Sequence, residues 1–466
     1  MGLRTLANLY RYLHTEIEFK YQELMWLERN RQLQSMQNPS PDFRWARTAE
    51  PYPKGLDRYM NIQPWGNNRI KLQVPEGYVN YINASPITVA PTAPRDETSP
   101  ATDTEPDRFI AMQGPKQATT DHVWRMIVEQ VENPGVIVML TETYESNQEK
   151  CFQYFPRRKE DPPLEINGHD EFGDGFLATV RCEEIEETPA GDAIQLRKLV
   201  VQVLARANKS TAGGTNGMST NNGLAGIATP EPSAPDQGDL DVNMKSPVAA
   251  TAKGATQADS DSGGLPAADT PPPEEEDSQR RNAAEVEELV IWHLLFKEWP
   301  DYGVPTLANI ENFFTLMRLS REKNTRPGNP RIVHCSAGVG RSGTFIALDH
   351  LIQELNAGAF EHYDEKMAAT RSGGTEMEAE NGESEGDDSE GPSKGDEVDD
   401  PIYNTVNQLR EQRRTMVQSE SQYLFIYQVM RKLWQDKYGR SEETEVGEPA
   451  AKRLEVDPFV GGGHPH

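Results

Sequence analysis

A long low-complexity stretch in the middle of the chain limits the possible folds more than any other feature. From Ala205 to about Ala284 the residues are mostly Ala, Gly, Ser, Thr, Pro and Asp, in runs such as STAGGTNGMSTNNGLAG and PAADTPPPEEED. Such residues bury too little apolar surface to offset the entropy that ordering costs. We therefore predict a disordered insertion over 205–284, so any folded domain must be assembled from segments on both sides of it.

A second tract, from Glu361 to Asp400, holds 15 Asp and Glu residues against three Lys and Arg residues. We predict that this tract is a solvated, disordered insertion, and that the tail over 441–466 is disordered as well. The whole chain carries a formal net charge of -27. Because it offers no electrostatic surface for phosphate backbones, we exclude nucleic acid as a partner.

The cysteine content and the N-terminus indicate where the protein resides. Its three cysteines, Cys151, Cys182 and Cys335, are too few for a disulfide scaffold and fit a reducing compartment. The N-terminus lacks a hydrophobic signal core, and no window approaches ~18 apolar residues, so we expect no membrane span. We expect a monomer in the cytoplasm, with the nucleus as a further location.

The segments between the low-complexity tracts have patterns of ordered structure. Apolar residues recur at helical spacing at Ile17, Tyr21, Leu24 and Leu27, which predicts a helix over 17–33. Further patterns predict helices over 121–131 and 344–355, and strands over 78–82, 135–140, 198–204, 289–297 and 331–334. Because helices and strands mix without strict alternation, we predict a single α/β domain with a twisted mixed β-sheet flanked by helices.

The predicted strand 331–334 leads into a loop of small residues whose backbone is suited to binding an anion. The loop contains Ser336, Ala337, Gly338, Val339 and Gly340. Its two glycines accept positive φ, so successive N–H groups can converge on one point. A helix that begins directly after the loop adds partial positive charge at the same place. The loop is therefore predicted to bind a tetrahedral oxyanion such as phosphate.

Two side chains at the ends of this loop, Cys335 and Arg341, supply the chemistry. Arg341 has a planar fork that can hold two oxygens of a phosphoryl group. The pKa of a thiol near an arginine and a helix N-terminus can fall to roughly 3.5 to 7.5, so we expect Cys335 to be a thiolate that attacks phosphorus. We expect Ser342 to donate a hydrogen bond to that sulfur and His334 to orient the cysteine.

Each of these residues also has a purely structural interpretation. A cysteine after a β-branched run is often a small buried hydrophobe, and glycines before a helix often form only a tight turn. The sequence GVGRSG is not a nucleotide-binding loop, because no Lys-Ser or Lys-Thr pair follows its last glycine. A cysteine, five small residues, an arginine and a hydroxyl in this order favour the catalytic interpretation.

At these residues the chain resembles the protein tyrosine phosphatases, whose signature VHCSAGVGRSG it carries unchanged. Other segments are similar to family blocks in the expected order: RYMNIQP at 58–64, NYINAS at 80–85, FIAMQGP at 109–115, KCFQYFP at 150–156, WPDYGVP at 299–305 and MVQSESQYLFIY at 416–427. The resemblance implies a catalytic domain over 17–435, apart from the two insertions. The resemblance is to the intracellular, non-receptor members of the family, and among these to the fungal ones.

The reaction needs an acid, and the resemblance implies that Asp301 supplies it from a mobile loop. A tyrosine phenolate, whose pKa is near ~10, leaves slowly unless an acid protonates the ester oxygen. The same resemblance implies that Gln418 and Gln422 position the hydrolytic water, while Glu145 and Lys150 steady the arginine and the mobile loop. Helix capping by the glutamines and an exposed ion pair between the charged residues are the structural alternatives.

Tyr59 is implied to select the substrate. A ring beside the loop makes the pocket a deep aromatic slot, which phosphotyrosine fills and phosphoserine does not. Asn61 is implied to hold the substrate backbone. The family often has a basic residue at the position of Met60 and an aspartate at that of Asn61, so the resemblance does not carry over a preference for the flanking residues.

The implied function is hydrolysis of phosphotyrosine in proteins through a phosphocysteine intermediate, in intracellular signalling and without a metal or cofactor. Similarity to fungal relatives makes MAP kinases plausible substrates. Three alternatives stay open: a dual-specificity or lipid phosphatase, a catalytically impaired phosphotyrosine-binding module, and a scaffold whose insertions do the work. Residues 336–340 lack the lysines that inositol-phosphate readers usually carry, and an impaired module would be expected to lack Asp301, Cys335 or Arg341.

Overall fold

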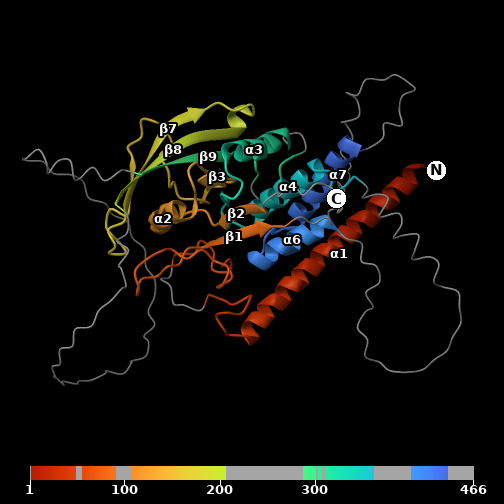
Figure 1. The fold of residues 1–466 in the computed structure, drawn as a ribbon. Coiled ribbons are helices and arrows are strands. Elements are labelled where there is room, and N and C mark those ends of the chain that lie inside the picture. The colour runs from red at the N-terminus through yellow and green to blue at the C-terminus, as the bar shows by residue number, and fades with distance from the viewer. Residues whose placement is uncertain are drawn as a thin grey trace, which may run out of the picture. The chain divides into compact units, whose positions relative to one another are not determined.

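A computed structural model gives the arrangement of the ordered segments (Figure 1). It describes residues 2–48, 55–90, 106–205, 287–300, 303–306, 310–361 and 400–438, without the side chains of 2–13 and 205. The tail predicted over 441–466 lies outside the described residues. So do the predicted insertions 205–284 and 361–400, apart from Ala205, Glu361 and Asp400 at their ends.

Helices and strands follow one another without strict alternation, as predicted. The helices are α1 (Gly2–Gln37), α2 (Thr120–Gln130), α3 (Ile310–Lys323), α4 (Gly340–Asn356), α6 (Pro401–Gln412) and α7 (Glu420–Tyr438), with 3-10 turns η1 (Gln117–Thr119) and η2 (Gly191–Ala193). The strands are β1 (Ala84–Val89), β2 (Asp107–Met112), β3 (Gly135–Met139), β4 (Tyr144–Glu145), β5 (Gln148–Glu149), β6 (Leu164–Ile166), β7 (Leu177–Glu186), β8 (Ile194–Ala205), β9 (Glu287–Phe296) and β10 (Arg331–His334).

Eight of these strands form one mixed sheet in the order β1-β2-β10-β3-β9-β8-β7-β6. Strand β10 is third from the β1 edge and runs parallel to both β2 and β3, while β3 is parallel to β9. The remaining neighbours are antiparallel. The predicted α/β fold with a mixed sheet is confirmed. The central parallel strands place the carboxyl end of β10, and the loop after it, beside the ends of β2 and β3.

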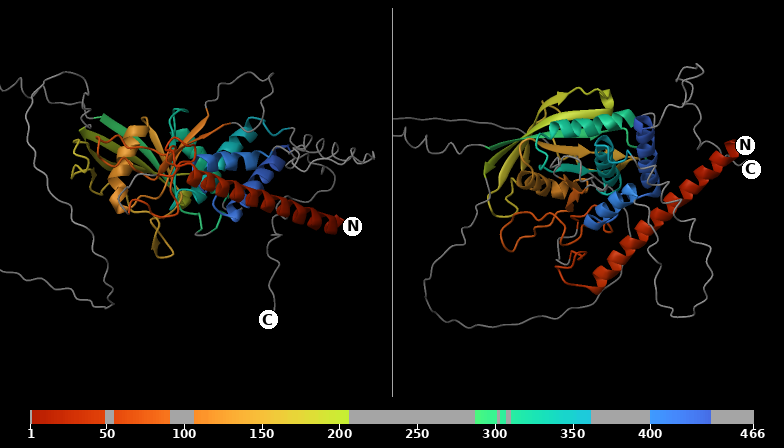
Figure 2. Two further views of the ribbon diagram at one scale, coloured as in Figure 1. Left: turned by 90° about the horizontal axis from the view of Figure 1, so that it is seen from below. Right: turned by 45° about the vertical axis from the view of Figure 1, so that its right-hand side comes forward.

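Both faces of the sheet are covered, because neighbouring residues of a strand point to opposite sides. Phe109, Ala111, Val136 and Val138 face the core formed with α3, α4, α6 and α7. Their neighbours, among them Ile110 and Ile137, face a second core that includes α2. Helix α1 runs across α6 and α7 (Figures 1 and 2) and contributes the buried side chains Tyr21 and Leu24 to the first core.

One predicted strand is wrong. Residues 78–82 contain only an isolated bridge between Tyr81 and Lys71, and the strand begins at Ala84. Gly77, at φ +93°, turns the chain just before this segment, and the side chain of Tyr81 is used in a hydrogen bond to Asp57. The β-branched pattern was therefore misleading, because local turn geometry and a polar contact override it.

Candidate active site

Cys335 follows directly after strand β10, at the start of the loop 335–339 that precedes α4. Its side chain is buried, with 4% of its surface exposed. The sulfur accepts a hydrogen bond from the N–H of Gly338 at 3.2 Å. An amide hydrogen directed at a sulfur stabilises negative charge on it. The cysteine thus lies inside the loop that was predicted to bind an anion.

Gly338 has a conformation that requires glycine. Its φ is +73°, and a Cβ at this position would lie 2.0 Å from the carbonyl oxygen of Met112. Any side chain would therefore meet the end of strand β2 as well as a strained backbone. Gly343 has no positive φ, but a side chain is excluded there too, since its Cβ would lie 2.4 Å from the backbone nitrogen of Val417.

The carbonyl groups of the loop are bound by groups outside it. The oxygen of Ser336 accepts from the N–H of Gly114 at 2.8 Å, and that of Val339 from the N–H of Val417 at 3.1 Å. The oxygens of Ala337 and Gly338 accept from one guanidinium, that of Arg413, at 3.3 and 2.9 Å. With these carbonyls held outward, the N–H of Gly338 points inward at the cysteine sulfur, as an anion nest requires.

Arg413 was missed by the sequence analysis. It is 1% exposed and also donates to the side chains of Ser85 and Asn83. Burial lowers its pKa to about 10, so it stays charged at neutral pH. Its neighbours in the sequence, RTMV and the polar run REQR, do not distinguish it from a solvated arginine. Only the tertiary contact with the loop shows what it does.

Arg341, in the first turn of α4, is held by Glu145 in a bidentate ion pair. Its Nη1 and Nη2 lie 2.5 and 2.8 Å from the two carboxylate oxygens of Glu145, and Nη1 also donates to the carbonyl of Leu140 at 3.0 Å. The carboxylate itself is fixed by the hydroxyl of Thr141 at 2.8 Å. The structure thus brings together the two residues that the resemblance paired. Lys150 is buried nearby, and its Nζ lies 3.4 Å from the amide oxygen of Gln148.

His334 lies behind the cysteine and is fully buried. Its Nδ1 lies 3.3 Å from the carbonyl oxygen of Cys335, so Nδ1 must carry the hydrogen. Its Nε2 then accepts from the hydroxyl of Tyr154 at 2.8 Å, a partner that the sequence analysis missed. Burial lowers the pKa of His334 to about 4, so the ring is neutral at physiological pH. It positions the peptide of Cys335 and adds no charge to it.

The contact expected for Ser342 does not form. Its side chain is buried, and its hydroxyl has no hydrogen-bond partner among the described residues. Cys335 is therefore not a partner of this hydroxyl in the structure.

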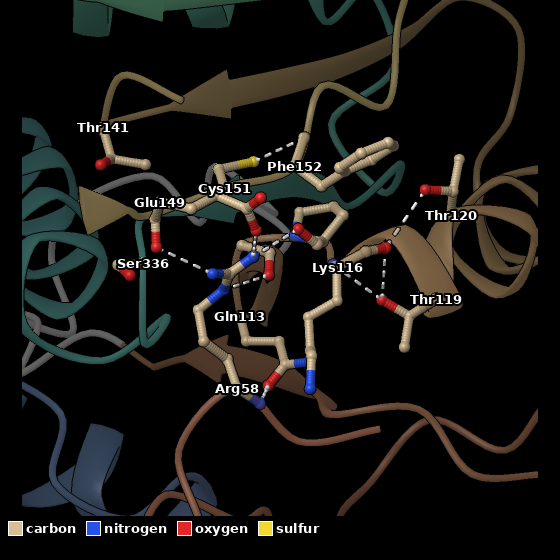
Figure 3. A network of polar contacts seen from close by, with 12 residues as sticks. Arg58, Gln113, Lys116, Thr119, Thr120, Thr141, Glu149, Cys151, Phe152 and Ser336 are labelled. Carbon is tan, nitrogen blue, oxygen red and sulfur yellow. Dashed lines mark hydrogen bonds and ion pairs between the residues drawn. The ribbon is translucent and has the colours of Figure 1, made fainter. Parts of the chain in front are cut away.

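Tyr59 stands beside the loop, with its hydroxyl 2.9 Å from that of Ser336. The preceding residue, Arg58, anchors it: its guanidinium donates to the carbonyls of Gly114, Pro115 and Glu149 and to the carboxylate of Glu149 (Figure 3). The segment that carries Tyr59 is thereby tied to the same β2 end that supports Gly338. Asn61 is exposed on the same segment.

The two predicted glutamines lie next to the start of α4. A Cβ at Gly340 would lie 3.0 Å from the side-chain amide of Gln422 and 3.3 Å from the Cβ of Gln418. Gln422 also caps α7, because its side-chain oxygen accepts from the N–H of Ser419 at 3.3 Å. The structural and the catalytic interpretations of Gln422 are thus compatible.

Asp301 lies outside the described residues. Among the described residues on either side of it, the indole of Trp299 donates to the carbonyl of Gly303 at 2.9 Å. The carbonyl of Pro300 lies 3.5 Å from Nη2 of Arg341. The base of the predicted acid loop therefore lies against the arginine of the site.

Residues 54–212, 274–373 and 393–432, more than half of the chain, match the family model described as Protein-tyrosine phosphatase. The chain belongs to the protein-tyrosine phosphatase family. Tyrosine-protein phosphatase 1 of Saccharomyces cerevisiae is 30% identical over 400 residues, which cover 85% of this chain and 88% of that protein. Human receptor-type tyrosine-protein phosphatase C is 27% identical over 420 residues, 89% of this chain but 20% of that protein. Protein-tyrosine-phosphatase activity follows from this membership.

Solved structures support the fold. One of PTPN18 in complex with HER2-pY1248 peptides has a TM-score of 0.51 at 17% identity, and it covers 90% of this chain and 99% of that chain. A second PTPN18 structure has a TM-score of 0.52 at 16% identity, covering 92% and 98%. No helix in the described part of this phosphatase has the length and hydropathy needed to cross a bilayer.

Proposed function

We propose that this phosphatase removes phosphate from phosphotyrosine in proteins through a phosphocysteine intermediate on Cys335. The observation that carries the proposal is the hydrogen bond from the N–H of Gly338 to the Cys335 sulfur, inside a loop whose carbonyls are bound outward. A phosphoryl group in this loop meets the remaining amide hydrogens and Arg341. Its phosphorus then faces the sulfur, which is the geometry for displacement of the ester oxygen.

In the first step the Cys335 thiolate attacks phosphorus. The S–P bond forms with the electron pair of sulfur, and the P–O bond to tyrosine breaks. The oxygen takes a proton from Asp301, so tyrosine leaves as a neutral phenol. Arg341, whose orientation is fixed by Glu145, stabilises the negative charge on the equatorial oxygens.

In the second step water hydrolyses the phosphocysteine. Asp301, now a carboxylate, removes a proton from a water that Gln418 and Gln422 position. The oxygen of that water bonds to phosphorus as the S–P bond breaks, which releases inorganic phosphate and regenerates the thiolate. The nearness of both glutamines to Gly340 supports these roles.

Tyr59 favours phosphotyrosine over phosphoserine and so argues against a dual-specificity phosphatase. Its ring stands at the edge of the loop and sets the depth of the slot, as its hydrogen bond to Ser336 indicates. A role in signalling, MAP kinases as substrates, and a monomer in the cytoplasm or nucleus remain predictions. Three free cysteines, Cys151, Cys182 and Cys335, support a reducing compartment.

The test is to quench turnover of a ³²P-labelled phosphotyrosine peptide with acid. We expect a covalent label on Cys335 that accumulates in Gln418→Ala, because hydrolysis slows while formation does not. Cys335→Ser should carry no label and should not hydrolyse a small aryl phosphate. Turnover by Cys335→Ser at the wild-type rate would contradict the mechanism, and absence of turnover by the wild type would favour a binding module.

A further inference from the structure

A short strained segment between α6 and α7 leads into Gln418. Thr415 and Val417 have φ values of +66° and +56°, although neither is glycine and both have β-branched side chains. A positive φ at a β-branched residue is a steric outlier, and it persists only where surrounding contacts hold the backbone in place. Without such contacts the segment would relax, and Gln418 would move away from the start of α4.

Helix α1 holds both ends of the segment 415–418. The hydroxyl of Tyr21 donates to the carbonyl oxygen of Gln418 at 2.6 Å. About two turns farther along the helix, the carboxylate of Glu28 accepts from the N–H and from the hydroxyl of Thr415, each at 3.0 Å. Tyr21 and Glu28 are buried, 7% and 5% exposed, so water competes little for these hydrogen bonds. The first and last residues of the strained segment are thus fixed to one helix.

Arg410 of α6 holds the middle of the segment. Its Nε and Nη2 donate to the carbonyl oxygens of Met416 and Val417, each at 2.9 Å. The side chain is fully buried, with Cζ 5.4 Å from the centre of the Tyr21 ring and Nη1 3.9 Å from a carboxylate oxygen of Glu28. A buried guanidinium needs an opposite charge nearby, and Glu28 supplies it. Glu28 therefore acts on the segment twice, once directly and once through Arg410.

We propose that α1, which lies outside the residues that match the family model, positions the segment 415–418 for the second chemical step. Tyr21 and Glu28 are the positioning residues, because they hold Gln418 where it can position the hydrolytic water. The inference rests on the proposed function, in which Gln418 acts after the phosphocysteine has formed.

The two chemical steps differ in how much they depend on this segment. In the described part of the chain, Tyr21 and Glu28 form hydrogen bonds to the segment 415–418 and none to Cys335 or Arg341. The sulfur and the guanidinium that act in the first step are held by Gly338 and Glu145 instead. A displaced segment should therefore slow hydrolysis of the phosphocysteine more than its formation.

The test separates the two steps in Tyr21→Phe and Glu28→Gln, which keep the shapes of the side chains. Tyr21→Phe removes the hydrogen bond to Gln418, and Glu28→Gln removes the charge beside Arg410 and one of the two acceptors for Thr415. With a small aryl phosphate, kcat/KM reports the steps through phosphocysteine formation, whereas kcat also includes hydrolysis. We expect kcat to fall about tenfold or more and kcat/KM to stay within about twofold, so that KM falls with kcat.

Both constants are referred to the amount of active enzyme, which the burst of phenol release measures, so a partly unfolded variant does not imitate the result. The covalent label that remains on Cys335 after a quench should increase in both variants. The matched control is Glu18→Gln, which makes the same change at an exposed position of α1 and should keep kcat and KM.

Two results would overturn the proposal: a fall in kcat/KM by the same factor as kcat, or an unchanged kcat in both variants. If the wild type itself carries no label on Cys335, the proposed function is wrong, and this inference fails with it. If the wild type is labelled and both variants hydrolyse the phosphocysteine at the wild-type rate, the inference alone is wrong.

Discussion

At the scale of single residues, the position of Gly338 determines whether the loop can hold its anion. Its N–H is bound to the Cys335 sulfur, its carbonyl to Arg413, and its Cα lies close against the end of β2. Any group added here must move the loop away from β2. The N–H then moves away from the sulfur, and a displacement of about 1 Å in an active site can cost about 10²-fold in rate.

Gly338→Ala is therefore expected to lower kcat by about 10²-fold or more and to destabilise the fold by about 1 to 3 kcal/mol. The matched control is Gly358→Ala. Gly358 also has a positive φ, +88°, but a Cβ there would have nothing within 4 Å. The control should lose about 1 kcal/mol of stability and keep its kcat. Equal losses of kcat in both variants would contradict a role specific to the loop.

A second residue-scale prediction concerns Arg413. Lysine keeps its charge but cannot bind Asn83, Ser85 and two loop carbonyls together, so Arg413→Lys should leave buried acceptors unpaired. We expect a loss of about 3 kcal/mol in urea unfolding and a clear fall in kcat. The neighbouring Arg414 stacks on Trp65, and Arg414→Lys should cost less than about 1 kcal/mol. A normal kcat in Arg413→Lys would exclude support of the loop by this side chain.

The sequence could predict those site residues whose roles depend on adjacent positions. Cys335 and Arg341 belong to one continuous turn, so spacing alone suggested a shared phosphate. Arg413 and Tyr154 act on that turn from other segments, and nothing near them in the sequence marks the contact. The expected hydrogen bond between Ser342 and the cysteine sulfur does not form, because adjacency in the sequence does not determine where a side chain points.

At the scale of elements, α6 begins where the acidic tract ends, and Asp400 defines the boundary. Its Oδ1 accepts from the N–H groups of Ile402 and Tyr403, with Pro401 at the first helical position. Its Oδ2 accepts from Lys20 of α1 and from the hydroxyl of Tyr427 of α7, each at 2.6 Å. One carboxylate thus joins three helices.

Asp400→Ala should destabilise the protein by about 2 to 3 kcal/mol, because it removes the cap and two bonds to other helices. Asp400→Asn retains an oxygen for the cap but loses the ion pair with Lys20, so its loss should be about half as large. Chemical denaturation of both variants measures the difference. Identical losses would mean that the cap contributes nothing. Catalysis by the folded fraction should be unaffected, since Asp400 does not contact the loop.

Element prediction worked best for buried strands such as β3 and β10, each of which is a short run of mostly apolar residues. Strand β10 was predicted with its observed bounds, and β3 and β9 to within two residues at each end. Helix α4 starts at Gly340, four residues before the predicted start, because glycines in its first turn hide the helical pattern. Helices α3 and α6 were not predicted, although their buried apolar residues, Ile310, Phe313, Leu316 and Met317 in α3 and Ile402, Val406 and Leu409 in α6, recur at helical spacing.

At the scale of the whole molecule, two buried histidines make stability depend on pH. Burial lowers the pKa of His334 to about 4 and that of His293 well below its usual value of 6.5. The unfolded chain takes up protons near pH 6.5, where the folded protein does not. The stability contributed by neutral histidines is therefore complete above about pH 6.5 and is lost as the pH falls toward 4.

For His334 alone the loss should be about 3 kcal/mol between pH 7 and pH 4. Urea unfolding at a series of pH values measures the slope, and His334→Gln should flatten it whatever its effect at pH 7. His14→Gln, at an exposed position of α1, provides the matched control variant. The same slope in His334→Gln and wild type would show that the buried ring is not responsible.

The outward-bound carbonyls of the catalytic loop accept hydrogen bonds from Gly114, which follows β2, and from Arg413 and Val417 in the segment between α6 and α7. Gly114 lies before both low-complexity tracts, and Arg413 and Val417 lie after them. The pocket therefore forms only when segments that are far apart in the sequence pack together. A tightly binding oxyanion such as vanadate should therefore stabilise the entire fold when it occupies the loop, and so raise the melting temperature. Fragments that end before Arg413 should gain no such protection.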